Sequence, residues 1–327
     1  MAGRRGRSGR ERWSGCRQEI TRPLRRIPHL PHLDLDGVTL WYDTVPSPNS
    51  DAPPALLIQG LGMQATDWPA SLLSSLASTR PLILFDNRDA GLSQLFGPQH
   101  DPELREEAFP GWNQPSGHPP YTLFDMAADT IRLLDALEIP TAHLAGFSMG
   151  GMIAQILGAQ HPDRVSSVSG LMTSAGQDWL NSTAEADRMM RRSIVQVADQ
   201  ESLVDFFLAA EEVFAGPSLI GDRSTRYQAT LAALSRGHHT AGIWRQALAM
   251  RATGDRRHLL GGTTVPLLMV HGREDPVIAF TQAAAITELR QDACFIELSQ
   301  TGHVLTEDNG GCVAGIISAF WDSLAQP

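Results

Sequence analysis

The 327-residue sequence predicts an α/β fold, with a mostly parallel, doubly wound sheet flanked by helices and interrupted by an inserted helical cap. Two observations predict the sheet. The first is a series of short apolar runs typical of buried strands, and the second is that these runs alternate with segments of helical periodicity. Such alternation favours parallel strands joined by helical crossovers. A third observation predicts the cap: residues 178–258 are helix-rich and break the alternation, so we expect them outside the sheet.

Each expected element follows from its own pattern. Segment 37–45 alternates apolar and polar residues as a half-buried strand does, whereas most later strand segments are continuous apolar runs. Segment 123–139 carries apolar residues at helical spacing and is closed by Pro140. The expected strands are 37–45, 54–60, 81–89, 141–147, 164–175, 265–272 and 294–299. The expected helices outside the cap are 67–78, 123–139, 148–161, 279–289 and 311–325.

The remaining segments define the domain organisation. Residues 1–28 are Arg-rich and lack the apolar stretch of a secretory signal, which predicts a disordered tail; a targeting or anion-binding arm is the alternative. The predicted core is 29–177 with 259–327, and the cap is 178–258. Residues 97–120 are rich in Pro and Gly, which predicts a long surface loop near a site. Segment 252–257 (ATGDRR) is expected to be a solvated helix end.

Composition argues against several classes of protein. All 26 basic residues are Arg, which we attribute to the base composition of a GC-rich bacterial genome. Nine of them lie in the first 26 residues, so the rest of the chain carries 17 basic and 34 acidic residues. Such an acidic body repels phosphate backbones, so we expect no nucleic-acid partner for the folded part. The sequence has no run of about 18 apolar residues, so we expect no membrane span.

The cysteines indicate a reducing compartment. Cys16, Cys294 and Cys312 are too few for a disulfide framework and lack the spacing of metal ligands. We therefore expect a cytoplasmic protein without metal or cofactor. Nothing in the sequence specifies its oligomeric state.

One serine stands in a glycine-rich setting between an expected strand and an expected helix. The stretch Gly146-Phe147-Ser148-Met149-Gly150 has the form G-x-S-x-G. At such a turn the serine backbone is strained, and residues two positions away approach too closely to carry a Cβ. The Ser148 hydroxyl would then project from the sheet beside the positive end of the helix, with the Met149 N–H nearby. Glycine-rich strand-to-helix turns also occur without any catalytic role.

Four motifs together resemble the α/β-hydrolase family. They are FDNRDAGLS at 85–93, AHLAGFSMGGMIAQ at 142–155, MVHGREDPV at 269–277 and TGH at 301–303. The resemblance runs from about residue 33 to the end and is nearest to bacterial esterases of the aclacinomycin methylesterase and mycobacterial lipase/esterase type. It implies a nucleophile, acid and base in the order Ser148, Asp275 and His303.

The implied acid and base each have competitors. Asp275 follows an expected strand, where the family places its acid; Glu274 is adjacent, and Asp178 is a remoter candidate. His303 lies in the loop between the last strand and the last helix, which is the family's position for the base. Other histidines are interpreted as packing or surface residues, among them His143, His161 and His271. In the implied roles, His303 exchanges protons with Ser148, and Asp275 fixes its tautomer.

The resemblance also implies an oxyanion hole, in which Leu61 and Met149 donate backbone N–H groups. The family commonly has His-Gly before the first donor, whereas this chain has Gln59-Gly60. Another departure is Asp89, where the family more often has Gly. We expect Asp86, Arg88 and Asp89 to form an ion-pair network that fixes a turn rather than to act in catalysis.

These features predict a serine hydrolase that cleaves a small-molecule carboxylic ester through an acyl-enzyme intermediate. Aromatic residues are available to line an apolar pocket for an acyl or aromatic group, but for most of them we favour the interpretation as cap core. They are Phe147, Phe206, Phe207, Phe214 and Trp244. Amidase, C–C hydrolase, thioesterase and cofactor-free perhydrolase chemistry stay open on the same three residues. A small-molecule receptor with little turnover is the alternative from another class.

Overall fold

The computed structural model describes residues 31–101, 103–104, 118–176, 181–195 and 199–324. Its centre is an eight-stranded sheet in the order β1-β2-β4-β3-β5-β6-β7-β8. The strands are β1 His32–Asp34, β2 Thr39–Val45, β3 Ala55–Ile58, β4 Leu82–Phe85, β5 Ala142–Phe147, β6 Val165–Leu171, β7 Leu267–Gly272 and β8 Cys294–Leu298. Only the pairings of β1 with β2 and of β2 with β4 are antiparallel. The predicted mostly parallel sheet is therefore confirmed, and β1 is a short addition that the pattern did not predict.

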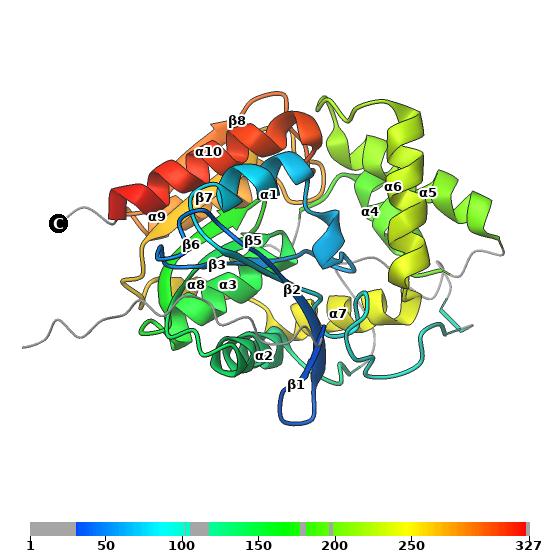
Figure 1. The fold of residues 1–327 in the computed structure, drawn as a ribbon. Helices are drawn as coiled ribbons and strands as arrows, with labels where there is room; N and C mark the ends of the chain where they lie inside the picture. Colours follow the sequence, from blue (N-terminus) through cyan, green and yellow to red (C-terminus); the bar gives the residue numbers. More distant parts are fainter. Residues whose placement is uncertain (1–30, 102, 105–117, 177–180, 196–198, 325–327) are drawn as a thin grey trace, which may run out of the picture.

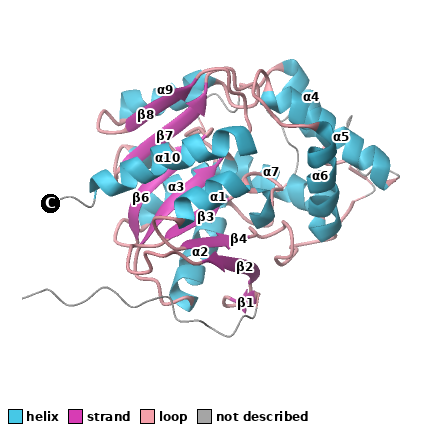
Figure 2. Cartoon of the chain, turned by 45° about the horizontal axis from the view of Figure 1, so that its top comes forward, coloured by secondary structure: helices cyan, strands magenta, loops and turns pink. Residues whose placement is uncertain are grey.

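Helices cover both faces of the sheet (Figures 1 and 2). They are α1 Ala70–Ala77, α2 Leu123–Ala136, α3 Met149–Gln160, α4 Ala184–Arg192, α5 Gln200–Ala215, α6 Arg223–Gly237, α7 Thr240–Thr253, α8 Arg257–Leu260, α9 Phe280–Leu289 and α10 Glu307–Leu324. Alternate residues of β3 divide between two apolar cores: Leu56 and Ile58 pack with α2 and α3, whereas Ala55 and Leu57 pack with α1 and α10. Successive side chains of a strand point to opposite faces of the sheet, and both faces are covered here, so nearly every strand residue has to be apolar.

Five helices of the described chain, α4 to α8, lie between β6 and β7, and we call the first four, α4 to α7, the insertion. Both views show α4, α5 and α6 together at one side of the sheet, with α7 nearer the core. The two parts of the insertion differ in burial. Helix α6 has no buried residue, whereas ten residues of α7 are buried and several of them, such as Ala247 and Met250, belong to the core formed with α2 and α3. The division of the chain into core and cap stays a prediction.

The expectation of a solvated helix end at 252–257 is wrong for Arg256. Its side chain is 1% exposed, and its guanidinium donates to the carbonyls of Gly254 at 2.7 Å and Ser174 at 3.0 Å. Burial lowers the pKa of Arg256 to about 10. Asp255 and Arg257 do form an exposed ion pair. The chain turns back at the end of α7 onto the segment that follows β6, and this tertiary contact carries no local signal in the sequence.

Several predicted segments fall partly or wholly outside the described residues. They are the tail 1–28, most of the loop 97–120, and residues 177–180 and 196–198 of the predicted cap or its border. Within the described part of the chain, no helix combines the length and apolar character that crossing a membrane requires.

Candidate active site

Ser148 lies at the turn between β5 and α3 in a conformation that few residues other than glycine adopt. Its φ is 52° and its ψ is −115°. The flanking glycines explain how the turn is so tight. A Cβ on Gly146 would lie 2.3 Å from the Gly150 carbonyl oxygen, and one on Gly150 would lie 2.0 Å from the Ile58 carbonyl oxygen. The backbone of Ser148 is held by β6, because its N–H donates to the Leu171 carbonyl at 2.8 Å.

His303 and Asp275 complete a continuous chain of polar contacts with this serine. His303 Nε2 lies 3.0 Å from Ser148 Oγ, and His303 Nδ1 lies 2.7 Å from Asp275 Oδ2. All three residues are 8% exposed. The structure thus brings together residues that are 127 and 28 positions apart in the sequence, on the turn after β5, the loop after β7 and the loop after β8.

The Asp275 carboxylate is saturated with donors. Oδ1 accepts the backbone N–H groups of Val277 and Ile278, both at 2.8 Å. Oδ2 contacts His303 and also His271 Nε2, at 3.1 Å. Burial alone would raise the pKa of Asp275, but the imidazole of His303 and the hydrogen bonds from His271 and His303 lower it to about 2. The carboxylate is therefore charged at neutral pH.

His271 lies at the end of a strand as expected, but its contact with Asp275 was not predicted from the sequence. Its Nε2 faces two acceptors, Asp275 Oδ2 and the Ile278 carbonyl oxygen at 2.9 Å, so this nitrogen carries the proton. The side chain is fully buried, as the interpretation as a packing residue requires, but it also holds the Asp275 carboxylate. Its place at the carboxyl end of β7, four residues before Asp275, was the available signal.

The competitors for the acid have other positions. Glu274 accepts the Thr301 N–H at 3.2 Å and so braces the loop that carries His303, without contacting the imidazole. Asp178 lies outside the described residues. Of the acids considered from the sequence, Asp275 is the one that the structure brings to His303.

The loop after β3 packs against the serine. We call residues 59–65 the oxyanion loop, after the role that the resemblance implies for Leu61. A Cβ on Gly60 would lie 3.2 Å from the Phe147 ring and 3.3 Å from Ser148 Cβ, so this backbone directly abuts the Ser148 side chain. Among the residues that the structure describes, neither Leu61 nor Met149 donates its backbone N–H to a protein acceptor. Gln59 replaces the family's usual histidine, and its Oε1 accepts the Gly60 N–H at 3.3 Å.

The aromatic residues expected near a pocket divide into two groups. Phe147 is buried with its ring 5.1 Å from that of His303, and the Phe214 carbonyl accepts the His303 N–H at 2.7 Å. Trp244 is half-buried on α7 against the core. By contrast, Phe206 and Phe207 pack on each other, 5.2 Å apart, and on other residues of the insertion, which favours their interpretation as cap core.

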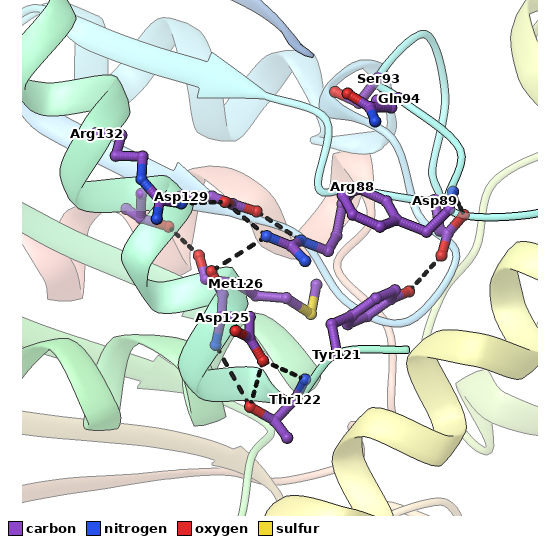
Figure 3. Close-up of polar contacts among 12 residues, drawn as sticks. Arg88, Asp89, Ser93, Gln94, Tyr121, Thr122, Asp125, Met126, Asp129 and Arg132 are labelled. Atoms are coloured by element: carbon purple, nitrogen blue, oxygen red, sulfur yellow. Dashed lines mark hydrogen bonds and ion pairs between the residues drawn. The ribbon is translucent and has the colours of Figure 1, made fainter. Parts of the chain in front are cut away.

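The acidic and basic residues after β4 form the predicted ion-pair network, which reaches further than one turn (Figure 3). Arg88 makes a two-point contact with Asp129 of α2, at 2.6 and 2.7 Å, and its guanidinium lies over the Tyr121 ring. Asp89 accepts two hydrogen bonds from Arg245 of α7, and the Tyr121 hydroxyl donates to it at 2.6 Å.

Asp86 completes the network by pairing with Arg236 of α6 at 2.7 Å. The three charged residues of one loop thus connect it to α2, α6 and α7. Asp89 has a φ of 66°, which explains why glycine suits this position in the family.

The chain belongs to the alpha/beta hydrolase fold family, whose model matches residues 53–310, so the family predicted from the motifs is confirmed. Rhodomycin D methylesterase DauP of Streptomyces sp. (strain C5) is 30% identical over 141 residues, which are 43% of this chain and 41% of that protein. 3-Oxoadipate enol-lactonase 2 of Acinetobacter baylyi (strain ATCC 33305 / BD413 / ADP1) is 27% identical over 169 residues, 52% of this chain and 60% of that protein. The chain spans less than half the length of the methylesterase it matches.

Solved structures share the fold over most of the chain. The enol-lactonase from Burkholderia xenovorans LB400 has a TM-score of 0.68 at 20% identity and covers 89% of this chain and 100% of its own. The esterase RhEst1 from Rhodococcus sp. ECU1013 has a TM-score of 0.67 at 21% identity and covers 90% of this chain and 98% of its own. At these identities the similarity shows a common fold.

Proposed function

We propose that this protein is a serine hydrolase that cleaves a carboxylic ester through an acyl-enzyme intermediate, with Ser148 as nucleophile, His303 as base and Asp275 as acid. The observation that carries the proposal is the pair of contacts at His303, 3.0 Å to Ser148 Oγ and 2.7 Å to Asp275 Oδ2. An ionised carboxylate accepts hydrogen bonds only, so His303 Nδ1 carries a proton and Nε2 is free to accept one from the serine.

Acylation follows from this arrangement. Ser148 Oγ attacks the ester carbonyl carbon while its proton passes to His303 Nε2, and the N–H groups of Leu61 and Met149 stabilise the negative oxygen of the tetrahedral intermediate. The bond from the carbonyl carbon to the alkoxy oxygen then breaks. His303 returns the proton to this oxygen, and an alcohol leaves.

Deacylation uses the same groups. A water molecule loses a proton to His303 Nε2 and attacks the acyl carbon. The bond from the acyl carbon to Ser148 Oγ then breaks, His303 returns the proton to Oγ, and a carboxylic acid leaves. Asp275 stays ionised throughout and stabilises the imidazolium, which agrees with a pKa of about 2 for this carboxyl.

The proposed substrate is a small ester with an apolar acyl or aromatic group. Phe147 and Phe214 contact His303 through ring and backbone, and both side chains are apolar. Relatives are named methylesterase and enol-lactonase, and both names describe cleavage of a carboxylic ester or its cyclic form. These similarities support an ester over the amide, thioester and C–C alternatives.

The test measures p-nitrophenyl ester turnover, from acetate to octanoate, and covalent labelling by a fluorophosphonate. Wild type is compared with Ser148→Ala and with Ser224→Ala, which removes an exposed hydroxyl of the insertion. We expect turnover and labelling to be lost in Ser148→Ala and kept in Ser224→Ala, with the label located on Ser148 by peptide mass spectrometry. Wild type that is neither labelled nor active would overturn the proposal and favour a small-molecule receptor.

A further inference from the structure

One buried side chain of the insertion, that of Gln246, connects the oxyanion loop to the loop after β4. The Gly62 N–H donates to Gln246 Oε1 at 2.8 Å, and Gln246 Nε2 donates to the Arg88 carbonyl at 2.7 Å. The Gln246 side chain is fully buried on α7. One amide thus bridges the loop after β3 and the loop after β4 with both of its polar ends satisfied.

Packing reinforces this bridge. Gly62 has a φ of 68°, and a Cβ there would lie 2.7 Å from Ile243 Cγ1, so α7 presses directly on the oxyanion loop. Helix α6 holds the other end of the loop. Gln64 donates to the Ala233 carbonyl at 2.7 Å and accepts from Arg236 Nη1 at 2.6 Å.

Leu61 lies between Gln59, whose carbonyl accepts from Asn87 Nδ2 at 3.1 Å, and the attachment at Gly62. Because the Gly62 amide is fixed by Gln246, the backbone on the carboxyl side of Leu61 has little freedom to rotate. An oxyanion donor acts only within about 2.7–3.1 Å of the developing charge, and a displacement of about 1 Å can lower the rate by up to about 10²-fold. The position of the Leu61 N–H is therefore sensitive to the contact at Gly62.

We propose that Gln246 is a positioning residue for the oxyanion hole, and that the insertion takes part in catalysis through it. The inference rests on the proposed function. Gln246 acts through Gly62 and the Leu61 backbone, so its loss should weaken stabilisation of the tetrahedral intermediate while leaving ground-state binding intact.

The experiment compares Gln246→Met, which keeps the volume but loses both hydrogen bonds, with a matched control. The control is Gln155→Met on α3, where the glutamine is 1% exposed and its side-chain amide has no hydrogen-bond partner among the described residues. For each variant we would measure kcat and KM on a p-nitrophenyl ester. Inhibition constants of an alkylboronic acid, which forms a tetrahedral adduct with serine, and of the product carboxylic acid are measured in parallel.

We expect kcat of Gln246→Met to fall by about 10- to 100-fold with KM within about twofold, and the boronic acid inhibition constant to rise in proportion. Product binding and the control variant should be unchanged. Gln246→Glu, which keeps an acceptor for the Gly62 N–H, should recover part of the lost kcat. If Gln246→Met does not fold, Ile243→Ala tests the same contact, and the same split between kcat and KM is expected.

Two results would overturn the inference. One is a kcat of folded Gln246→Met, or of Ile243→Ala in its place, within twofold of wild type. The other is an equal loss of boronic acid and product binding, which indicates general disorder of the site. Wild type without turnover would instead remove the proposed function itself, so the two failures are distinguishable.

Discussion

Replacing Asp89 by the glycine that the family more often has should destabilise this protein, although the backbone there favours glycine. Asp89 has a φ of 66°, and relief of this conformation is worth about 1–2 kcal/mol. Against this gain stand four hydrogen bonds to a carboxylate with no exposed surface. Arg245 donates two, at 2.6 and 2.9 Å, and the Tyr121 hydroxyl and the Phe96 N–H donate the others.

The larger effect on stability comes from the Arg245 guanidinium, which would stay buried without its carboxylate partner. The Arg245 side chain is only 10% exposed, and without Asp89 it keeps one described acceptor, the Pro98 carbonyl at 3.0 Å. Removing one partner of a buried ion pair costs about 3–5 kcal/mol. We therefore expect Asp89→Gly to lower the free energy of unfolding by about 1–4 kcal/mol after the relief of strain.

The assay is urea unfolding followed by circular dichroism and tryptophan fluorescence for wild type, Asp89→Gly, Arg245→Met and the double variant. If an unpaired guanidinium causes the loss, the double variant should be more stable than the sum of the single losses predicts. Equal stability of Asp89→Gly and wild type, or strict additivity of the two losses, would refute this reasoning.

Three further predictions concern the proposed acid, a buried histidine and the turn at the proposed nucleophile. Asp275→Asn should lower kcat by about 10⁴-fold in steady-state assays, because His303 loses the partner that fixes its tautomer, whereas Glu274→Gln should lower it far less. Burial, with a smaller contribution from Arg80, lowers the pKa of His143 to about 3 from an ordinary 6.5, so the unfolded chain binds the extra proton between these values. The free energy of unfolding should therefore fall as pH drops below about 6.5, and His143→Phe should flatten its measured pH dependence between pH 4.5 and 7. Gly150→Ala should not give folded, active protein, because the new methyl carbon would lie 2.0 Å from the Ile58 oxygen; normal circular dichroism and turnover would contradict this.

The sequence predicted those features that are local in the chain. Periodicity placed all strands of the parallel part of the sheet, and the five residues from Gly146 to Gly150 carried the tight turn, because the need for glycine is a property of the turn itself. The last helix begins at Glu307, earlier than the apolar pattern indicated, since Glu307 and Asp308 precede that pattern. A helix whose first turn is polar therefore begins before the point at which its apolar periodicity can be recognised.

Features that depend on tertiary contact escaped prediction. The buried guanidinium of Arg256 is hydrogen-bonded to the carbonyls of Ser174, which is distant in the sequence, and of Gly254, which lies in the turn after α7. The second imidazole in contact with Asp275 belongs to His271, which the sequence had indicated only as a packing residue. Asp86, Arg88 and Asp89 were expected to form an ion-pair network within one turn. In the structure each of them pairs with a residue of a different helix. The sequence shows which charged and polar groups would need a partner if they were buried. Which segment supplies that partner depends on tertiary contacts and cannot be predicted from the local pattern.

The contacts of the insertion argue that it does more than cover a site. The Ser182 hydroxyl and the Thr183 N–H, just before α4, donate to the carbonyls of Val277 and Pro276 in the loop of Asp275. After α5, the Ser218 hydroxyl accepts the Gly302 N–H beside His303. Helices α6 and α7 contact the oxyanion loop as described above. The insertion is therefore hydrogen-bonded to every loop that bears a proposed catalytic group other than the nucleophile. A motion of these helices would therefore displace the proposed acid, base and oxyanion donor at once, and substitutions in the insertion should change kcat as well as KM.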